Sequence, residues 1–485
     1  MLKPYQEVGV EWMLDRLRKN NFAWIADEQG LGKTLQIITT VKQRTDVKDI
    51  IVICPAIAKI SWEKEIEKWD PDASTSPMEM QDIVLSGSDR RCYHIHSYDK
   101  ISRDDNLTAS LKDLAELESS MVVLDEHHYL KSFASKRTQR IFGVTQGIAT
   151  VARRYGAGVI AASGTPAPDW PVDIYPLAQV MADEVTLAPN GERMSYDQFW
   201  RRYHVVERMK GKLNHIEVTR SIRTDTIKQL WQRTKPVLLR RTKEQVAKDI
   251  PPLVWGFGEI HAPRQKLYRA IKRRLDEKGD TLLALELIEI RLRQGQISAD
   301  QALEELGDIP HLSVVMQAVA EIKVASLSST IESSWTALTA PRRLVFYVHR
   351  DIGDELQSKI DDTLLHNPQR RPWARIDGAT SQKARQLIMN DFQDGRYQGI
   401  LGQIKAMGTA ITLTKATAVE YVETSFTPAD VAQSAARAHR IGTTHRVTAT
   451  IWRLTDTFDD MIQRIVTDKA SAVAGLTNEG AQHDE

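Results

Sequence analysis

The strongest constraint on the fold is a rhythm of short apolar runs that alternate with helical stretches, twice along the chain. In the first half the apolar runs are at residues 22–26, 50–53, 93–96, 121–124 and 159–162. In the second half they are at 344–348, 374–376, 399–401, 419–422 and 447–452. Strands that alternate with helices form parallel sheets covered by helices. The sequence therefore predicts an α/β protein with two mostly parallel sheets and helical insertions.

The interruptions of this rhythm predict the domain boundaries. A chain of 485 residues is long enough for two α/β cores. Residues 1–185 carry the first alternation, and 186–245 break it with a basic, mixed composition that predicts a helical protrusion. The second alternation occupies 246–485 and contains a long helical insertion at about 264–334.

Composition excludes several classes of protein. Apolar residues make up 42% of the chain and charged residues 27%, as in ordinary globular proteins. Two cysteines, Cys54 and Cys92, are too few for a disulfide scaffold or a cysteine-rich zinc module and fit a reducing compartment. No apolar run approaches the roughly 18–20 residues of a membrane span. The N-terminus lacks a signal-peptide pattern. We therefore expect an intracellular protein.

The segment IADEQGLGKTLQ (25–36) has the context of a P-loop, because an apolar strand precedes it and a helical pattern follows. Backbone N–H groups at the start of such a helix point at anionic phosphates. Lys33 would contact the β- and γ-phosphates of a nucleotide, and the Thr34 hydroxyl would ligate Mg²⁺. Asp27 stands where the usual motif has its first glycine.

Two further strand ends carry candidate catalytic groups. MVVLDEHHYLKS places Asp125 and Glu126 after a buried strand, where they could hold Mg²⁺ through water and polarise an attacking water. The following histidines, His127 and His128, do not form a zinc site, since neighbouring positions do not share a helical face. ASGTPAP (162–168) follows another strand and offers the Ser163 and Thr165 hydroxyls as sensors of the γ-phosphate.

Near the C-terminus, DVAQSAARAHRIG (430–442) spaces Gln433, Arg437 and Arg440 at i, i+4 and i+7. A helix would put these three side chains on one face. Two guanidinium groups beside an amide suit a triphosphate whose transition state carries spread negative charge. The alternative is a basic helix on the surface.

Charge is unevenly distributed although the whole chain carries a net charge of only +1. Residues 201–243 contain thirteen lysines and arginines against three acids, and Trp200, Tyr203 and Trp231 lie in or beside them. Clustered positive charge with interleaved aromatic residues suits a phosphate backbone. The alternative is a solvated helical face whose charge is balanced elsewhere in the fold.

Taken in this order, the motifs resemble those of the Swi/Snf-type helicase-like ATPases of superfamily 2, in a compact form with a single motor. The likeness runs from Leu2 to about Val466. LKPYQEVGVEW resembles the family's Q motif, DEQGLGKT its P-loop, DEHH its DEAH box, SGTP its motif III and QSAARAHRIG its motif VI. LLRRTKEQVAKDIPP (238–252) is typical of the segment that bridges the family's two lobes. Residues 319–335 resemble the branch that includes annealing helicases.

The resemblance implies two RecA-like lobes with ATP in the cleft between them. It implies an ATP-binding set of Gln6, Asp27, Gly30, Leu31, Gly32, Lys33 and Thr34. The implied catalytic residues are Lys33, Asp125, Glu126, Gln433, Arg437 and Arg440. Mg²⁺ would be held by Thr34 and Asp125, largely through water, and Ser163 and Thr165 would couple nucleotide state to motion. The implied DNA-binding residues are Pro55, Trp62, Ser97, Tyr98, His349, Gly408 and Thr409. His94 and His96, in HIHSYDKI (94–101), are expected to be strand residues.

The sequence thus predicts a nucleic-acid-stimulated ATPase that translocates on duplex DNA as a monomer, with ATP and Mg²⁺ as cofactors and no membrane association. A strand-separating or annealing helicase and an ATP-gated DNA-binding scaffold stay open as alternatives. A small-molecule P-loop kinase would need neither the second sheet nor the paired arginines. RNA as the track and an additional protein partner also stay open. The expected location is the cytoplasm of a bacterial or phage-infected cell, at the nucleoid.

Overall fold

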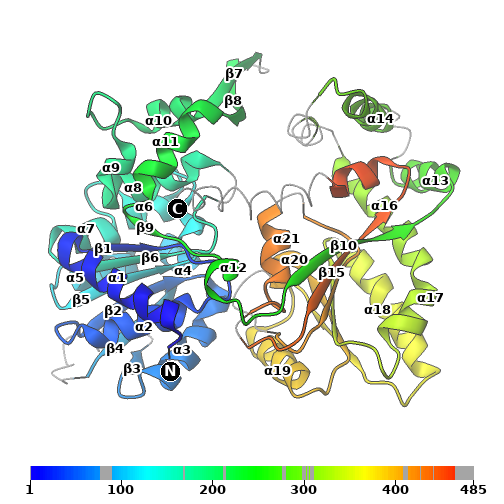
Figure 1. Ribbon diagram of the computed structural model, residues 1–485, viewed down its shortest axis with the longest axis horizontal. Coiled ribbons are helices and arrows are strands. Elements are labelled where there is room, and N and C mark those ends of the chain that lie inside the picture. The colour runs from blue at the N-terminus through cyan, green and yellow to red at the C-terminus, as the bar shows by residue number, and fades with distance from the viewer. Residues whose placement is uncertain are drawn as a thin grey trace. The chain divides into compact units, whose positions relative to one another are not determined.

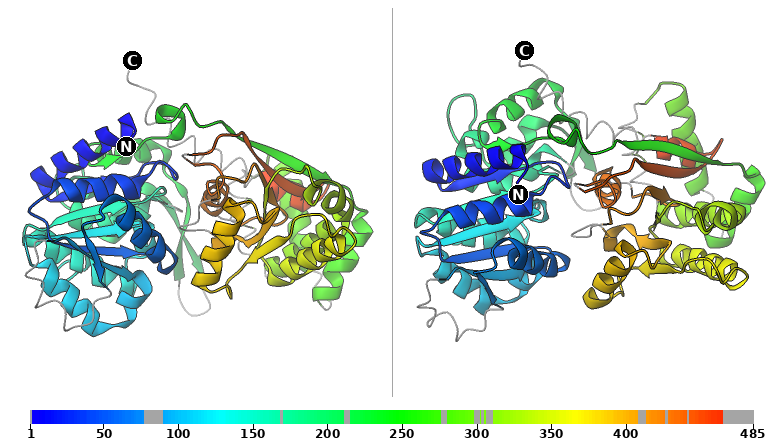
Figure 2. Two further views of the ribbon diagram at one scale, coloured as in Figure 1. Left: turned by 90° about the horizontal axis from the view of Figure 1, so that it is seen from below. Right: turned by 60° about the horizontal axis from the view of Figure 1, so that its bottom comes forward.

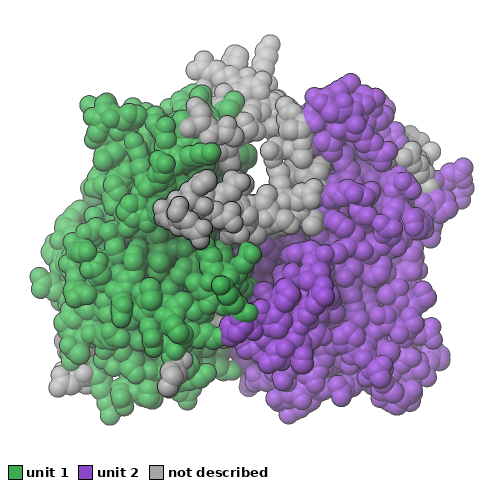
Figure 3. Space-filling model, in the orientation of Figure 1, with its two compact units in different colours: residues 1–248 green, residues 249–485 purple. Residues whose placement is uncertain are grey.

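The chain forms two compact units, residues 1–248 and residues 249–485 (Figure 3). The structure is a computed structural model. The residues that it describes are 2–76, 90–167, 170–210, 215–275, 280–297, 302, 305, 311–407, 413–425, 428–440 and 442–464.

The first unit is built on a seven-stranded sheet with the order β3-β4-β2-β5-β6-β1-β9, and every described strand pair in it is parallel (Figure 1). The strands are β1 (Phe22–Ile25), β2 (Asp49–Cys54), β3 (Ser74–Ser76), β4 (Cys92–Ser97), β5 (Ser120–Asp125), β6 (Gly158–Ala162) and β9 (Leu238–Leu239). All five strands predicted for this half are confirmed. Strands β3 and β9 were not predicted, because they are too short to produce a hydrophobic pattern.

Helices lie on both faces of this sheet (Figures 1 and 2). One face carries α1 (Pro4–Asn20), α2 (Lys33–Gln43), η1 (Ala56–Ala58) and α3 (Lys59–Trp69). The other carries α4 (Tyr98–Arg103), α5 (Asp105–Ala115), η2 (His127–Leu130), α6 (Lys136–Phe142), α7 (Ile148–Arg154), η3 (Pro171–Ile174) and α8 (Tyr175–Met181). Because both faces are covered, the central strands are buried throughout, which explains their unbroken apolar sequences.

The segment predicted as a basic helical protrusion is helical only in part. It follows α9 (Asp183–Thr186) and contains α10 (Tyr196–Tyr203), β7 (His204–Lys210), β8 (His215–Ile222), α11 (Thr224–Thr234), β9 and α12 (Lys243–Val246). The strands β7 and β8 pair as a two-stranded antiparallel ribbon. The helical prediction was wrong for β7 and β8, because the β-branched residues of HVVERMK and HIEVTRSI favour strands.

The second unit has a six-stranded sheet with the order β10-β15-β14-β11-β13-β12, again parallel at every described pair. Its strands are β10 (Leu253–Ile260), β11 (Arg343–Tyr347), β12 (Trp373–Ile376), β13 (Gly399–Gln403), β14 (Ala418–Tyr421) and β15 (Val447–Leu454). The five predicted strands are confirmed, and β10 was missed because glycines interrupt its pattern. A Cβ at Gly258 would lie 2.3 Å from the Trp452 ring, so glycine lets β10 pack against β15.

Helices accompany the second sheet as well. The helices of the second unit are α13 (Arg264–Leu275), α14 (Asp280–Arg293), α16 (Leu312–Ser326), α17 (Ser328–Thr330), η4 (Ile331–Trp335), α18 (Arg350–Leu365), α19 (Gln382–Gln393), α20 (Ile404–Met407) and α21 (Pro428–Ala435). Those that contact the strands include α16, α18 and α20. Of these, α16 packs against α13, α18 and β15. Among the described helices, no single one is long and apolar enough to cross a membrane. Helix α16 and residues 328–335 together have the length and apolar composition of a membrane span, but the pair is bent by 50°.

A buried ion pair fixes α16 to the end of β15. Lys323 Nζ lies 2.8 Å from Asp459 Oδ2, and the two side chains are 2% and 0% exposed. Asp459 also accepts the backbone N–H of Leu454 at 2.7 Å and the side-chain amide of Gln463 at 3.1 Å. A buried carboxylate with this many donors is well compensated, but it depends on the lysine for its counter-charge.

We expect Lys323→Met to lower the free energy of unfolding of the second unit by about 3–5 kcal/mol, because it leaves a buried carboxylate without a counter-charge. Urea unfolding of the full chain, followed by tryptophan fluorescence, measures this loss. Arg396→Met is the control, since it removes only pairs of an arginine side chain that is 65% exposed, and it should cost less than about 1 kcal/mol. Equal losses in the two variants would contradict the role given to the buried pair.

Candidate nucleotide-binding site

The P-loop lies between β1 and α2, and its conformation requires glycine. Gly30 and Gly32 have φ angles of 87° and 76°, a region that other residues rarely adopt. A third glycine approaches from β6: a Cβ at Gly164 would lie 2.5 Å from Gln29 Cγ and 3.4 Å from Lys33 Nζ. Lys33 Nζ donates to the carbonyl oxygen of Asp27 at 2.8 Å. The loop that follows β6 therefore lies directly against the P-loop lysine.

The residues of this loop fit an anionic ligand. The eleven-residue helix α2 begins at Lys33, and its N-cap, Gly32, offers no side chain to the N–H groups of the first turn. Both polar atoms of the Gln29 amide are buried without a hydrogen-bond partner among the described residues. An uncapped helix N-terminus and an orphaned buried amide are what a bound phosphate would satisfy. Thr34 follows in the first turn of α2.

Asp27, which replaces the first glycine of the usual motif, is the buried partner of an arginine. Its carboxylate is 0% exposed and receives Arg241 Nε at 2.9 Å and Nη2 at 2.5 Å. Gln36 Nε2 also donates to it at 3.2 Å. The Arg241 guanidinium lies 5.4 Å from the ring centroid of Tyr5. Asp27 therefore anchors the P-loop through its side chain.

The segment that carries Arg241 runs alongside the P-loop. The carbonyl oxygens of Leu239 and Arg241 accept the N–H groups of Ala26 and Glu28, at 2.7 and 2.9 Å. Arg240 Nη1 donates to the carbonyl oxygens of Ala26 and Gly164, at 3.2 and 3.1 Å. Lys243 Nζ lies 3.1 Å from Glu28 Oε1. We call residues 238–243 the clasp.

The clasp arginines were predicted to belong to a basic surface, with no role at the site. That part of the prediction was wrong: Arg240, Arg241 and Lys243 are engaged with the P-loop. Arg233 donates to the carbonyl oxygen of Leu187, and Tyr203 is fully buried. The sequence signal for this role was the Arg-Arg pair that directly follows two apolar residues. Residues that follow a parallel strand lie at the carboxyl edge of the sheet, where the P-loop also lies.

The acidic pair lies at the carboxyl end of β5. Strand β6 separates β5 from β1, the strand that leads into the P-loop. Asp125 Oδ2 accepts the indole N–H of Trp62 at 2.8 Å, and its backbone carbonyl accepts the Tyr98 hydroxyl at 2.8 Å. Burial and then the charge of Glu126 raise the pKa of Asp125 to about 6, while the Trp62 hydrogen bond and the Lys33 charge act to lower it. A partly buried acid within the field of the P-loop lysine is suited to a cation.

Glu126 is held in a small network with the loop after β6. It has a φ of 54°, and its Oε2 accepts the Ser163 hydroxyl at 3.3 Å. His128 Nδ1 lies 2.9 Å from Ser163 Oγ and 3.2 Å from Glu126 Oε2. The N–H of Thr165 donates to the same Ser163 Oγ at 3.1 Å. The structure thus brings the two predicted coupling residues next to the predicted catalytic acid.

The two adjacent histidines point to different surroundings. His127 Nε2 accepts the indole N–H of Trp24 at 2.8 Å in the core. Burial and the neighbouring His128 lower the pKa of His127 to about 3, so this ring stays neutral. His128 instead faces Glu126. The two rings therefore face different partners.

Gln6, predicted to read adenine, lies beside the P-loop and is 3% exposed. Its Nε2 donates to the carbonyl oxygen of Leu31 at 3.1 Å, and its Oε1 accepts the Lys3 N–H at 2.9 Å. The Tyr5 hydroxyl donates to the same Leu31 carbonyl at 3.3 Å. In this structure Gln6 braces the loop, and adenine reading stays a prediction.

Several predicted DNA contacts are buried instead. Pro55 is buried, and Trp62 and Tyr98 are each 1% exposed and point at Asp125. The side chains of Trp62 and Tyr98 therefore support Asp125. DNA binding through the backbone of these segments stays a prediction. Gly408 and Thr409 lie outside the described residues.

Ser97 is the one predicted contact at an open depression of the first unit. It caps α4 by accepting the Lys100 N–H at 3.2 Å. The depression measures 790 Å³ and is lined by Ser97, Asp99, Lys100, Arg103, Asp104, Asp105 and Asn106. Three acids among these residues oppose the binding of a phosphate backbone.

His349, a predicted DNA contact in the second unit, is held by two partners. Its Nδ1 lies 2.6 Å from Glu423 Oε1, and its Nε2 lies 2.8 Å from Ser313 Oγ. Glu423 Oε2 also accepts the N–H groups of Val348 and His349, at 2.8 and 2.9 Å. The hydrogen bond to Glu423 raises the pKa of His349, against the opposing effect of burial.

The predicted helical face of Gln433, Arg437 and Arg440 is wrong. Helix α21 ends at Ala435, and the chain continues in turns, with the Arg437 N–H bonded to the Ser434 carbonyl. Tertiary contacts draw the chain away from the helix: the Arg437 carbonyl accepts the Leu413 N–H at 2.9 Å, and His439 Nε2 lies 2.8 Å from the Pro251 carbonyl. Gln433 and Arg437 are 8% and 5% exposed, which also excludes a basic helix on the surface.

Comparison with known proteins decides the family. A model of the SNF2-related domain matches residues 5–294, and a model of the helicase conserved C-terminal domain matches residues 323–442. The chain belongs to the SNF2 family. The resemblance inferred from the motifs is therefore confirmed, and the two parallel-sheet units are the two RecA-like lobes of a helicase-like ATPase. The use of ATP follows from membership of this family.

Relatives of this SNF2 chain cover nearly all of it. It is 24% identical over 98% of its length to a Caenorhabditis elegans homolog of SWI/SNF-related matrix-associated actin-dependent regulator of chromatin subfamily A-like protein 1, of which it covers 62%. It is 26% identical over 91% of its length to the putative ATP-dependent helicase/translocase YwqA of Bacillus subtilis, of which it covers 45%. It is 24% identical over 98% of its length to the human DNA annealing helicase and endonuclease ZRANB3, of which it covers 40%.

The chain therefore spans less than two thirds of the length of these relatives. Among solved structures, the Sulfolobus solfataricus SWI2/SNF2 ATPase core in complex with dsDNA aligns over 98% of this chain and 92% of that chain. The identity is 18% and the TM-score is 0.41.

Removing the clasp arginine should destabilise the first unit. We expect Arg241→Met to lower its free energy of unfolding by about 3–5 kcal/mol, because Asp27 would stay buried without a counter-charge. Asp27→Asn combined with Arg241→Met should cost less than the sum of the single changes. Lys19→Met, which removes a lysine that is 64% exposed, is the control and should cost under about 1 kcal/mol. Additive losses in urea unfolding would count against a coupled pair.

The His349–Glu423 contact predicts a pH dependence of stability. A histidine whose pKa rises on folding stabilises fully below its unfolded value of about 6.5, and this contribution is lost as pH rises through the folded value. The stability gap between the wild type and His349→Gln should therefore be wider at about pH 6 than at about pH 9. His366→Gln, at a side chain that is 71% exposed, should show no such narrowing. Urea midpoints across this range provide the test, and a constant gap for His349→Gln would refute the contact's role.

Proposed function

We propose that this chain is an ATP-driven motor that translocates along duplex DNA, with Mg²⁺ as cofactor. The observation that carries this proposal is the convergence of three strand ends, β1, β6 and β5, at one edge of the first sheet. These strands bring together Lys33, the Ser163 loop, and the Asp125–Glu126 pair. A phosphate-binding loop beside a paired acid is the arrangement that nucleoside triphosphate hydrolysis requires.

The residues divide the chemistry between them. Lys33 and the first-turn N–H groups of α2 bind and orient the phosphates. Thr34 and Asp125 would hold Mg²⁺, Asp125 largely through water, and the ion when bound offsets charge on the β- and γ-phosphate oxygens. Glu126 orients the attacking water and takes up its proton. Ser163 holds the Glu126 carboxylate, so a shift of the Ser163 loop would change the position of the base.

The second lobe would supply the remaining positive charge. Gln433, Arg437 and Arg440 belong to the block matched by the helicase C-terminal model. A guanidinium that meets the transferring phosphoryl group contributes about 10³–10⁵ in rate in related enzymes. Because the two sets lie on different lobes, hydrolysis would alternate with opening and closing of the cleft, which is the two-state element that a motor needs.

Two other activities are alternatives to translocation. The human relative is described as a DNA annealing helicase, which favours annealing or strand separation as the second candidate. An ATP-gated scaffold belongs to a different class and would need no hydrolysis. The intact set of Lys33, Asp125 and Glu126 counts against the scaffold.

The deciding measurement is the rate of ATP hydrolysis without nucleic acid, with single-stranded DNA, with blunt duplex and with a fork. We expect blunt duplex to stimulate the wild type, and Glu126→Gln to lower kcat by about 10²–10⁴, the usual contribution of a positioned general base. Glu118→Gln, at an exposed glutamate, is the matched control and should leave the rate unchanged. The stimulation should fall steeply with salt, because bound phosphates release counterions.

Each other outcome assigns a different function. Stimulation only by forks or single strands would replace translocation by annealing or strand separation. The absence of stimulation by any of these DNA molecules would remove the motor and leave the scaffold. A flat response to salt would argue against a mechanism that follows the phosphate backbone.

A further inference from the structure

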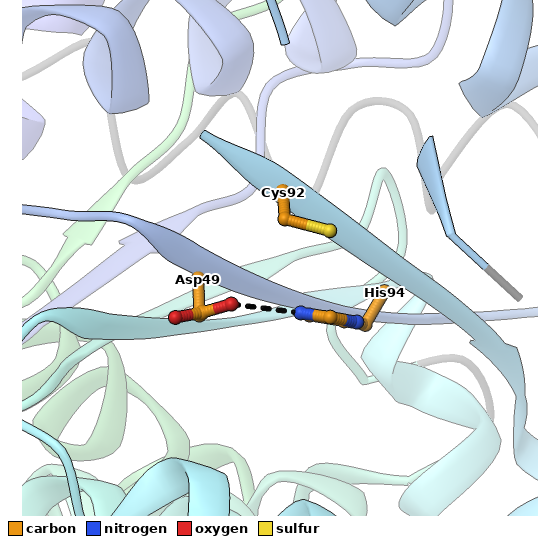
Figure 4. A group of neighbouring side chains, drawn as sticks. All are labelled: Asp49, Cys92 and His94. Atoms are coloured by element: carbon orange, nitrogen blue, oxygen red, sulfur yellow. Dashed lines mark hydrogen bonds and ion pairs between the residues drawn. The ribbon is translucent and has the colours of Figure 1, made fainter. Parts of the chain in front are cut away.

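Three side chains with metal-binding chemistry meet at the edge of the first sheet opposite the nucleotide site. Asp49 begins β2 and Cys92 begins β4, and the two residues are register partners in neighbouring strands. His94 follows Cys92 by two positions and therefore points to the same face of the sheet. Figure 4 shows the three side chains gathered on that face. Strand pairing fixes the backbone of all three.

The distances are close to those of a metal centre. Asp49 Oδ1 lies 2.9 Å from His94 Nε2, and one ligand atom from each of the three residues lies within 4.8 Å of the others. In a tetrahedral zinc site, with bonds of about 2.0 Å to nitrogen or oxygen and about 2.3 Å to sulfur, ligand atoms lie about 3.3–3.5 Å apart. Side-chain rotations that move the donor atoms by about 1 Å would produce this geometry without moving the strands.

The cluster is mostly buried, but part of it is open to solvent. His94 is 5% exposed, and its Nδ1 is buried without a hydrogen-bond partner among the described residues. Within the described part of the chain, therefore, no hydrogen bond at Nδ1 opposes a turn of the ring toward an ion. The Asp49 side chain is 18% exposed and Cys92 is partly exposed, so an ion can enter from solvent.

We propose that Asp49, Cys92 and His94 bind a zinc ion that ties β2 to β4. A thiolate with an imidazole and one carboxylate is a donor set for zinc, whereas Mg²⁺ and Ca²⁺ take oxygen donors. Three protein ligands leave a fourth position for water. The ion would replace the hydrogen bonds within the cluster and stabilise the strand pair that carries the edge strand β3.

This site is separate from the nucleotide site and does not depend on the proposed function. Asp49 pairs with Ser120 at the start of β5, whereas Asp125 ends that strand. Five residues of β-strand place the two positions about 16 Å apart. The cluster therefore offers a second metal position with a different donor set from that of the Mg²⁺ site.

The test uses the untagged full chain, stripped of metal and titrated with Co²⁺ at about pH 8, since ligand deprotonation favours binding. We expect one Co²⁺ per chain, a sulfur-to-cobalt charge-transfer band, and displacement of the band by Zn²⁺. Cys92→Ser should abolish the band, and Asp49→Asn and His94→Gln should each weaken binding at least tenfold. Cys54→Ala is the matched control, because Cys54 is the only other cysteine, is buried, and should leave the band intact.

Two measurements keep the proposal falsifiable if a variant folds poorly. Circular dichroism checks each variant, and Zn²⁺ should raise the Tm of the wild type but not that of Cys92→Ser. Glu126→Gln should bind Co²⁺ like the wild type, which separates this site from the nucleotide site. The absence of a charge-transfer band in the wild type, or its persistence in Cys92→Ser, would overturn the proposal.

Discussion

The nucleotide site depends on the buried ion pair between Asp27 and Arg241. Its carboxylate belongs to the P-loop and its guanidinium to the clasp, more than two hundred residues further along the chain. The pair fixes the start of the loop at Asp27. Gly30 and Gly32 adopt positive φ angles further along the same loop. A buried charge is tolerated only with its partner in place, which makes the formation of the P-loop conditional on the docking of the clasp.

The clasp also connects the parts of the site to one another. Arg240 donates both to Ala26, at the end of the P-loop strand, and to Gly164, next to Ser163. Ser163 in turn contacts Glu126, and Trp62 and Tyr98 hold Asp125. The clasp ends at residue 243, a short distance in the chain before residue 249, where the second unit begins. The same few residues therefore hold the P-loop and lie close in the chain to the start of the second lobe.

The sequence predicted the interior of both sheets because buried parallel strands are apolar throughout. It missed β10, whose glycines fit against Trp452, and it missed the ribbon of β7 and β8 within a segment characterised by charge. The helical spacing of Gln433, Arg437 and Arg440 was a local argument, and contacts with Leu413 and Pro251 overrode it. Trp62 and Tyr98 were assigned to DNA by motif position, and only their packing shows that they support Asp125.

Local sequence alone determined the strand and helix alternation, the P-loop, the paired acids and the family, because these depend on residues that are neighbours in the chain. Tertiary structure decided which distant groups meet: Arg241 with Asp27, Ser163 with Glu126, and Asp49 with Cys92 and His94. The physical reason is that a buried charge or donor takes its partner from whatever strand end lies beside it. Sheet order sets that neighbour, and no local pattern in the chain records it.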